Sequence, residues 1–151
     1  MNDSENIDSL HGEMTLSIVL LYWSLHDRLD CVSPHLSKQE RLFLIRLASP
    51  LRMGNLAKIM QALPSTLTTL ADGLEAQGLV QRQRDPDDRR AWLLELTQTG
   101  HAARRELLES AGLALREATG LPDADLETFS ALLFRIRDHI LAQGLPKGMP
   151  F

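Results

Sequence analysis

Apolar residues in the middle of the chain recur with helical spacing in two consecutive stretches. In the first stretch, which begins at Gly54, the apolar positions are Leu56, Ile59, Met60 and Leu63. In the second stretch, which begins at Pro64, they are Leu67, Leu70, Ala71 and Leu74. Residues three and four apart share one face of a helix, so each stretch predicts a short amphipathic helix. Pro64 suits the first turn of the second helix, because its missing N–H has no partner there, and Gly78 suits the left-handed position just past its end.

The pattern changes to that of β-strands after Gly78. Leu79 to Arg84 and Ala91 to Thr97 are typical of two strands, the second with Trp92, Leu94 and Leu96 on one face. The segment Asp85-Pro86-Asp87-Asp88-Arg89-Arg90 joins them as a turn. The short segment Leu51-Arg52-Met53 is expected to add a strand that pairs with this hairpin. Helix, turn, helix and arginine-bearing hairpin together predict a winged helix-turn-helix.

Longer helices are predicted on both sides of this motif. They run from Glu13 to about Leu29, from Lys38 to about Ala48, from Thr97 to about Thr119 and from about Asp123 to Gln143. Ser37 and Glu40 have the capping-box spacing, and the acidic stretch before Gly12 predicts a frayed end. The first helix is apolar nearly all round, and one small domain rarely buries such a helix on every side. We therefore expect a mainly α fold with a small β-wing, flanked by N- and C-terminal dimerisation helices.

The string GLVQRQRDPDDRRAWLLELTQTG resembles the wing signature of the MarR (multiple antibiotic resistance regulator) family. In that signature Gly-Leu-Val leads into a basic strand, an Asp-x-Arg tip and a Leu-Thr-x-x-Gly helix start, and the matching residues here are Asp88, Arg90, Leu96, Thr97 and Gly100. The resemblance implies a single domain over residues 1–151, with a DNA-binding lobe at about 36–100 and dimerisation helices at about 13–30 and 101–143. It also implies a homodimeric transcription regulator that a small ligand or oxidation often releases from DNA.

Charge on its own argues against a nucleic-acid partner. The 151 residues carry a formal net charge of -4 with a pI near 5.7, whereas affinity for DNA comes largely from neutralising phosphates. The distribution of charge matters more than the sum. Arg82, Arg84, Arg89 and Arg90 cluster on the predicted hairpin, although three aspartates interrupt the same stretch.

The second motif helix supplies candidate DNA contacts. With its leucines inward, a helical wheel points Ser65 and Thr69 outward and puts Thr66 and Thr68 on the flanks. Hydroxyls bond phosphates or base edges, and threonine methyls pack on thymine. The competing interpretation is that serine and threonine merely begin a helix. Many relatives of the family carry a basic residue where this chain has Thr69 or Gly73, so their operator preference does not transfer.

The resemblance also assigns roles on the hairpin. It implies that Arg90 enters the minor groove and that Asp88 holds the wing arginines, and a guanidinium suits a narrow, electronegative groove. We expect Arg82 and Arg84 to approach phosphates and Arg89 to add positive charge at the tip. The competing interpretation is a solvated charged hairpin.

A small aromatic or phenolic ligand is a further expectation from the family. Trp23, His26 and Arg46 are the candidate contacts in a cleft where relatives bind aromatic acids, although core packing or a solvent-facing arginine explains each residue more commonly. Cys31 is the single cysteine and follows the first helix instead of preceding it, so a structural thiol is favoured over an oxidation sensor.

Other kinds of chemistry find no support in the sequence. The five histidines show no metal-ligand spacing, and no phosphate loop, nucleophile elbow or supported carboxylate pair occurs, so we expect no metal, no cofactor and no enzyme. One cysteine, no signal peptide and no apolar run long enough to cross a bilayer predict a cytoplasmic protein without a membrane partner. The alternative to DNA binding is a dimeric winged-helix interaction module, motivated by the acidic surface.

Overall fold

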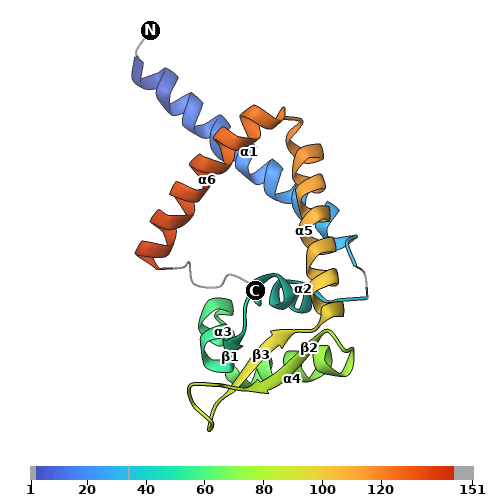
Figure 1. Ribbon diagram of the computed structural model, residues 1–151. Helices are drawn as coiled ribbons and strands as arrows, with labels where there is room; N and C mark the ends of the chain where they lie inside the picture. Colours follow the sequence, from blue (N-terminus) through green and yellow to red (C-terminus); the bar gives the residue numbers. More distant parts are fainter. Residues whose placement is uncertain (1–2, 34, 145–151) are drawn as a thin grey trace. The chain divides into compact units, whose positions relative to one another are not determined.

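A computed structural model describes residues 3–33 and 35–144, and the side chains among them from Ser9 onward. The elements, in chain order, are α1 (Asp3–Asp30), α2 (Lys38–Arg46), β1 (Leu51–Arg52), α3 (Met53–Met60), α4 (Pro64–Ala76), β2 (Val80–Arg84), β3 (Trp92–Leu96), α5 (Gln98–Thr119) and α6 (Asp123–Gln143). They form two compact units (Figure 1). One unit holds α1, the part of α5 from Ser110 and α6, and the other runs from Ser33 to Glu109. The mainly helical fold class predicted from the sequence is confirmed.

The unit from Ser33 to Glu109 is a winged helix. Its sheet has three antiparallel strands in the order β1-β3-β2, so the predicted short strand at Leu51 and Arg52 is confirmed. Val80 pairs with Leu96 at one end of the hairpin and Arg84 with Trp92 at the other. Helices α3 and α4 pack on each other, and α4 packs beside β2 (Figure 1).

Apolar side chains from the helices and from the β2–β3 hairpin form the core of this unit. The largest fully buried side chains are Phe43, Leu44, Leu47, Leu56, Leu67, Leu74 and Val80. On α4 the buried positions are three and four apart, which matches the amphipathic pattern of the sequence. The face of α4 opposite the core is therefore fixed in orientation by the packing of its leucines.

The sequence predictions for three helix ends are confirmed. Ser37 accepts a hydrogen bond from the Glu40 backbone N–H, and the Glu40 carboxylate accepts one from the Ser37 N–H, which completes the capping box. Pro64 is the first residue of α4. Gly78 follows α4 with a φ of 71°, and the Leu79 N–H reaches back to the Leu74 carbonyl, as in a Schellman turn.

The start of α5 joins the wing to the helix through Thr97 and Gly100. The Thr97 hydroxyl accepts from the Gly100 N–H at 3.0 Å and donates to the Gly78 carbonyl at 2.6 Å, so Thr97 caps the helix whose start the sequence places at this residue. The Thr97 N–H donates to the Leu79 carbonyl at 3.1 Å. A Cβ atom on Gly100 would lie 1.9 Å from the oxygen of that carbonyl. Only glycine fits between α5 and the carbonyl of Leu79.

Two expectations about helix ends are wrong. Helix α3 ends at Met60 because Gln61 takes a left-handed conformation with φ 50°, so Leu63 lies in the turn and is 71% exposed. Ile59, expected on the apolar face, is 45% exposed. Helix α1 begins at Asp3, so the acidic stretch predicted to be frayed is helical. Periodicity identifies a helix better than it locates its ends.

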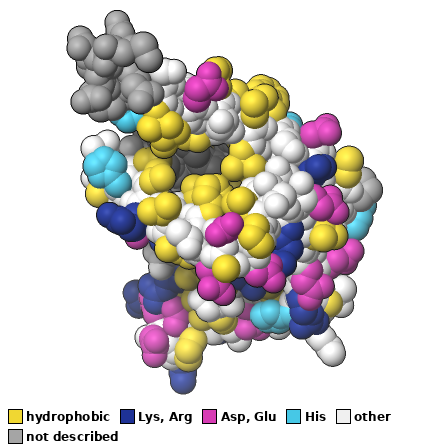
Figure 2. All heavy atoms as spheres, turned by 90° about the horizontal axis from the view of Figure 1, so that it is seen from above, with side chains coloured by type: hydrophobic (Ala, Val, Ile, Leu, Met, Phe, Trp, Pro, Cys, Tyr) yellow, Lys and Arg dark blue, Asp and Glu magenta, His cyan; other side chains and the backbone are white. Residues whose placement is uncertain are grey.

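The unit with α1 and α6 has little buried surface of its own. Helix α6 has no buried residue among its described side chains, although it carries leucine, isoleucine and phenylalanine along its length. On α1, Leu16, Ile18 and Leu20 are each more than half exposed. Hydrophobic side chains are visible over much of the face shown in Figure 2. This unit presents apolar surface that the chain itself does not cover.

Candidate nucleic-acid interface

The outer face of α4 carries the hydroxyl side chains expected there. Ser65, Thr68 and Thr69 are exposed, Thr66 is half-buried, and Asp72 continues the exposed face. No side chain caps the N-terminus of α4, whose first turn also lacks an acidic residue. The first backbone N–H groups of such a helix are the groups that bind anions most readily. The geometry of this face is compatible with a phosphate backbone.

The two exposed threonines bond their own helix. The Thr68 hydroxyl donates to the Pro64 carbonyl at 2.9 Å, and the Thr69 hydroxyl donates to the Ser65 carbonyl at 3.2 Å. A hydroxyl has one proton to donate, so each threonine keeps only acceptor capacity and its methyl group for other contacts. Among the described contacts, the Ser65 hydroxyl donates to no backbone carbonyl.

Arg82 on β2 connects the wing to α4. Its guanidinium lies 2.5 Å from the Asp72 carboxylate and also pairs with Glu75. The hydrogen bond to Asp72 is the main cause of a raised Arg82 pKa, with the charge of Glu75 adding to it against the cost of burial. We expected Arg82 to approach phosphates, and in the structure it holds α4 against the hairpin.

The turn of the wing is built on Asp85, which is buried. Its carboxylate accepts a hydrogen bond from the Asp87 backbone N–H at 2.9 Å and one from Arg52 Nε at 2.7 Å. These bonds, the backbone one first, hold the Asp85 pKa below its ordinary value against the opposing effect of burial. The hydrogen bond that Arg52 donates to the Asp85 carboxylate, with the charge of that carboxylate, likewise raises the Arg52 pKa. A buried carboxylate thus ties the wing to β1.

Asp88 also stabilises the turn. One of its oxygens accepts from the Arg90 backbone N–H at 3.1 Å, and the other lies 3.7 Å from the Arg52 guanidinium. The family resemblance implies that Asp88 holds the wing arginines, and the bond seen here is to the Arg90 backbone. The Arg90 side chain is left to solvent.

The tip of the wing presents positive charge. Arg84 stacks over the Trp92 ring at 4.1 Å and donates to the Arg89 carbonyl at 3.0 Å, which orders the base of the tip. Arg89 and Arg90 are exposed, and within the described part of the chain neither guanidinium pairs with a carboxylate. Asp85 and Asp88, two of the three aspartates of the turn, are engaged with Arg52, and Asp87 is exposed. The wing is locally basic on an acidic protein.

Asp85→Asn should remove a pH-dependent contribution to stability. A carboxylate with a depressed pKa in the folded state stabilises the fold above its unfolded pKa, about pH 4, and this contribution is lost as pH falls through the folded value. We expect the variant to be less stable than the wild type at pH 7, with the difference shrinking as pH drops below about 4. Urea unfolding from pH 7 to about pH 3 measures this. Asp87→Asn, which removes an exposed carboxylate, is the control, and parallel wild-type and Asp85→Asn curves would contradict the assignment.

Sequence reasoning missed Arg52 and treated Asp85 only as a charge that weakens the basic cluster. The pairing depends on β1 lying beside β3, which brings residues 52 and 85 together across a long stretch of chain. The register of β1 was not predicted, so the pair had no local signal. The available hint was an aspartate directly before a proline at the end of a strand, where a side chain commonly bonds backbone N–H groups of the turn.

The candidate ligand residues belong to different units. Trp23 and His26 lie on α1, where their rings are 5.7 Å apart, and Tyr22 contacts both. Trp23 is 60% exposed. Arg46 is the last residue of α2, in the winged-helix unit, and its side chain is exposed. Trp23 and His26 therefore form a small aromatic cluster within one unit, and Arg46 belongs to the other unit.

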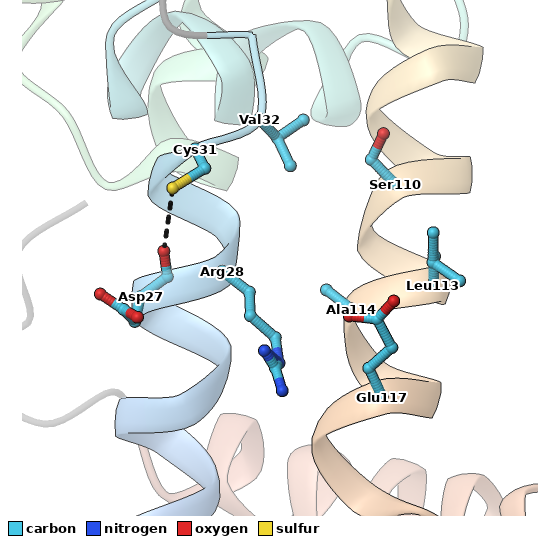
Figure 3. A pocket seen from close by; sticks show the side chains of 8 residues that line it. All are labelled: Asp27, Arg28, Cys31, Val32, Ser110, Leu113, Ala114 and Glu117. Carbon is cyan, nitrogen blue, oxygen red and sulfur yellow. Dashed lines mark hydrogen bonds between the residues drawn. The ribbon is translucent and has the colours of Figure 1, made fainter.

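A separate pocket lies between the end of α1 and α5, within one unit. Its volume is about 450 Å³, and its lining residues are Asp27, Arg28, Cys31, Val32, Ser110, Leu113, Ala114 and Glu117 (Figure 3). Cys31 is exposed and its thiol donates to the Asp27 carbonyl at 3.6 Å. None of the three ligand candidates lines this pocket.

Among the described residues, no group of three or more His, Cys, Asp or Glu side chains is placed to hold a metal ion. No helix in the described ranges combines the length and the apolar character that crossing a membrane requires.

Comparison with known proteins agrees with the wing motif. The model of the MarR family matches residues 25–92, a range that includes the helix-turn-helix and most of the wing. No curated protein sequence matches the chain. Among solved structures, YusO from Bacillus subtilis is 23% identical with a TM-score of 0.65, over 91% of this chain and 98% of that one.

MarR itself from E. coli, in its apo form, is 24% identical with a TM-score of 0.61, over 84% of this chain and 96% of that one. A cysteine-to-serine variant of the E. coli protein, crystallised with operator DNA, is 23% identical with a TM-score of 0.55 and covers 90% and 99% of the two chains. At these identities the structural likeness shows a shared fold, and the family model adds the match in sequence. Wing motif, fold and family model all point to the same family, since residues 25–92 match the model of the MarR family and the solved structures of the same fold include MarR itself.

Proposed function

We propose that this protein is a ligand-responsive repressor that binds a pseudo-palindromic operator as a homodimer. The observation that carries the proposal is the wing, where Arg89 and Arg90 are exposed and pair with no carboxylate of the described residues, beside an α4 face of exposed hydroxyls. A turn held by Asp85 and Arg52 presents the wing, and Arg82 fixes α4 to it. A related structure of the same fold contains operator DNA, which supports assigning this surface to DNA.

Each side chain on the candidate surface then has a role. Arg90 enters the minor groove, Arg89 and Arg84 lie near phosphates, and α4 enters the major groove with Ser65, Thr66, Thr68 and Thr69 as its DNA contacts. Arg82 differs from the other wing arginines. Because Asp72 and Glu75 hold its guanidinium, we propose that it positions α4 and adds at most a secondary phosphate contact.

Selection of duplexes from a random pool by the purified protein tests this function. We expect enrichment of a sequence with two related half-sites about one helical turn, roughly 10 bp, apart. The absence of any enriched sequence would favour the alternative, a dimeric interaction module. The observation behind that alternative is that α4 contains no lysine or arginine and exposes Asp72.

The dimer is proposed to form through α1 and α6. Helix α6 buries none of its described side chains, and Phe134 and Ile136 are 54% and 53% exposed, while α1 exposes leucine and isoleucine along its length. A soluble helix with this much uncovered apolar surface normally packs against another chain. The second copy supplies the same helices, as two-fold symmetry requires.

Sedimentation at low micromolar concentration should give about twice the chain mass of 16.9 kDa. Ile136→Glu places a charge in the proposed interface, and we expect it to raise the dimer dissociation constant by at least about tenfold. Ile59→Glu is the control, because Ile59 is similarly exposed but lies on α3 in the winged-helix unit. A folded wild-type monomer, or equal dissociation by both variants, would contradict the proposed interface.

The ligand response is proposed on narrower grounds, namely the aromatic cluster of Trp23 and His26. An aromatic or phenolic acid bound there should quench Trp23 and weaken DNA binding by a coupling of about 1–3 kcal/mol. Trp92→Phe leaves Trp23 as the only tryptophan, so its fluorescence reports this site alone. Quenching without any change in DNA affinity would show that the ligand binds and would contradict the proposed regulation.

A further inference from the structure

The exposed threonines of α4 have little hydrogen-donating capacity to offer to DNA. Thr68 and Thr69 each donate their hydroxyl proton to a carbonyl one helical turn earlier, at 2.9 and 3.2 Å. What remains for a partner is a pair of acceptor lone pairs and a γ-methyl group on each side chain. Both residues are exposed, Thr69 on the helix face opposite buried Leu67, Ala71 and Leu74 and Thr68 on the flank of that face. Two neighbouring residues thus present methyl groups and acceptors outward.

The rest of α4 does not supply the missing donors beyond its first turn. The helix has no lysine or arginine, and the Asp72 carboxylate is paired with Arg82. Guanine presents only acceptors, N7 and O6, in the major groove and is usually read by arginine or lysine. A surface of methyl groups and acceptors is poorly suited to guanine. It matches the A·T pair, which offers the thymine C5-methyl group and the adenine N6 amine.

We propose that Thr68 and Thr69 read A·T pairs in the major groove by packing their methyl groups against the C5-methyl of thymine. The inference rests on the proposed DNA-binding function and specifies the bases that α4 selects. The hydroxyl oxygens, whose protons are spent within the helix, accept from the adenine N6 amine where the pair is oriented to allow it. The Ser65 hydroxyl, in the first turn of α4, donates a hydrogen bond to a DNA phosphate.

Replacing thymine by deoxyuridine tests this contact with a change of one methyl group on the DNA. In the selected operator, each thymine of both half-sites is replaced in turn, and the dissociation constant is measured by fluorescence anisotropy. We expect at least one position in each half-site where the replacement weakens wild-type binding about fourfold, which corresponds to about 0.8 kcal/mol for one buried methyl group. The DNA charge is unchanged, so the salt dependence of binding should not change.

Two kinds of variant identify the protein side of the contact. Thr68→Ser and Thr69→Ser remove a methyl group and keep the hydroxyl, whereas Thr68→Val and Thr69→Val keep methyl groups and remove the hydroxyl. At the sensitive thymine, we expect a serine variant to bind thymine and deoxyuridine operators equally. The matching valine variant should still lose about fourfold affinity when the thymine methyl group is removed. Circular dichroism and sedimentation confirm that each variant is folded and assembled as the wild type is.

The outcomes separate the inference from the function on which it rests. A selected operator to which wild type binds equally with thymine or deoxyuridine would overturn the inference and leave DNA binding intact. A thymine effect that persists unchanged in both serine variants would overturn it as well, because another group then contacts the methyl. Failure to select any preferred sequence would overturn the proposed function and the inference together.

Discussion

Gly100→Ala is expected to destabilise the protein by about 3–5 kcal/mol, enough to leave little folded protein. The added Cβ would lie 1.9 Å from the Leu79 carbonyl oxygen and 2.9 Å from its carbon. Both are backbone atoms, so no side-chain rotation relieves the clash. Moving the carbonyl would break its bond from the Thr97 N–H and separate the wing from the start of α5. Urea unfolding, or the yield of folded protein if the variant does not survive purification, measures the effect.

Gly112→Ala is the matched control, because it makes the same substitution within the same helix. A Cβ at Gly112 meets no atom within 4 Å, and alanine is favoured over glycine in a helix interior. We expect Gly112→Ala to be neutral or to stabilise by up to about 1 kcal/mol. If Gly100→Ala behaves like Gly112→Ala, the close approach of α5 to the Leu79 carbonyl is wrong.

Arg90→Ala is expected to weaken operator binding by about 1–3 kcal/mol for each wing that contacts DNA. The side chain projects from a turn that Asp88 orders through the Arg90 backbone N–H, so it meets the DNA from a fixed position. A guanidinium in a narrow minor groove senses groove width, which depends on sequence. The variant should therefore lose its preference for A·T pairs flanking each half-site as well as affinity. In a dimer whose half-sites act independently, the loss approaches twice the single-site value.

Two further variants distinguish groove reading from simple charge. Arg90→Lys keeps the charge but lacks the planar guanidinium. We therefore expect this variant to retain the attraction to phosphates and to lose the preference for A·T pairs flanking each half-site. Arg105→Ala removes an equally exposed arginine from α5 and should leave operator binding nearly unchanged. Equal losses for the operator and for random DNA in Arg90→Ala, with a salt slope lowered by about one for each wing that contacts DNA, would assign Arg90 to phosphate instead.

Local signals explain which parts of the fold were predictable. The capping box at Ser37, the proline at the start of α4 and the glycine after it each depend on neighbouring residues, so the sequence alone indicates them. The Leu-Thr-x-x-Gly motif predicts the helix start at Thr97 for the same reason. The end of α3 was less predictable, because Leu63 continues the helical spacing although Gln61 has already turned the chain into a left-handed conformation.

Contacts between distant residues explain what sequence reasoning missed at the candidate site. The Arg52–Asp85 pair needs the register of β1 against β3, and the Arg82 pairs with Asp72 and Glu75 need α4 beside β2. Neither arrangement has a periodicity that the chain displays locally. As a result, Arg82 was expected to contact phosphates. Asp85 was expected to weaken the positive charge of the wing, whereas its carboxylate stabilises the turn of the wing. The exposed charge at Arg89 and Arg90 followed from the motif itself.

The dissociation constants for a selected operator and for a scrambled duplex of equal composition test the central claim most directly. They are measured by anisotropy between about 50 and 200 mM salt. The proposed function predicts that the operator binds at least about a thousandfold more tightly than the scrambled duplex near physiological salt. Affinity for both should fall as salt rises, because wing arginines displace counterions from phosphates. Equal affinity for the two duplexes, in a protein shown to be folded and dimeric, would contradict the claim that α4 and the wing form a sequence-reading surface.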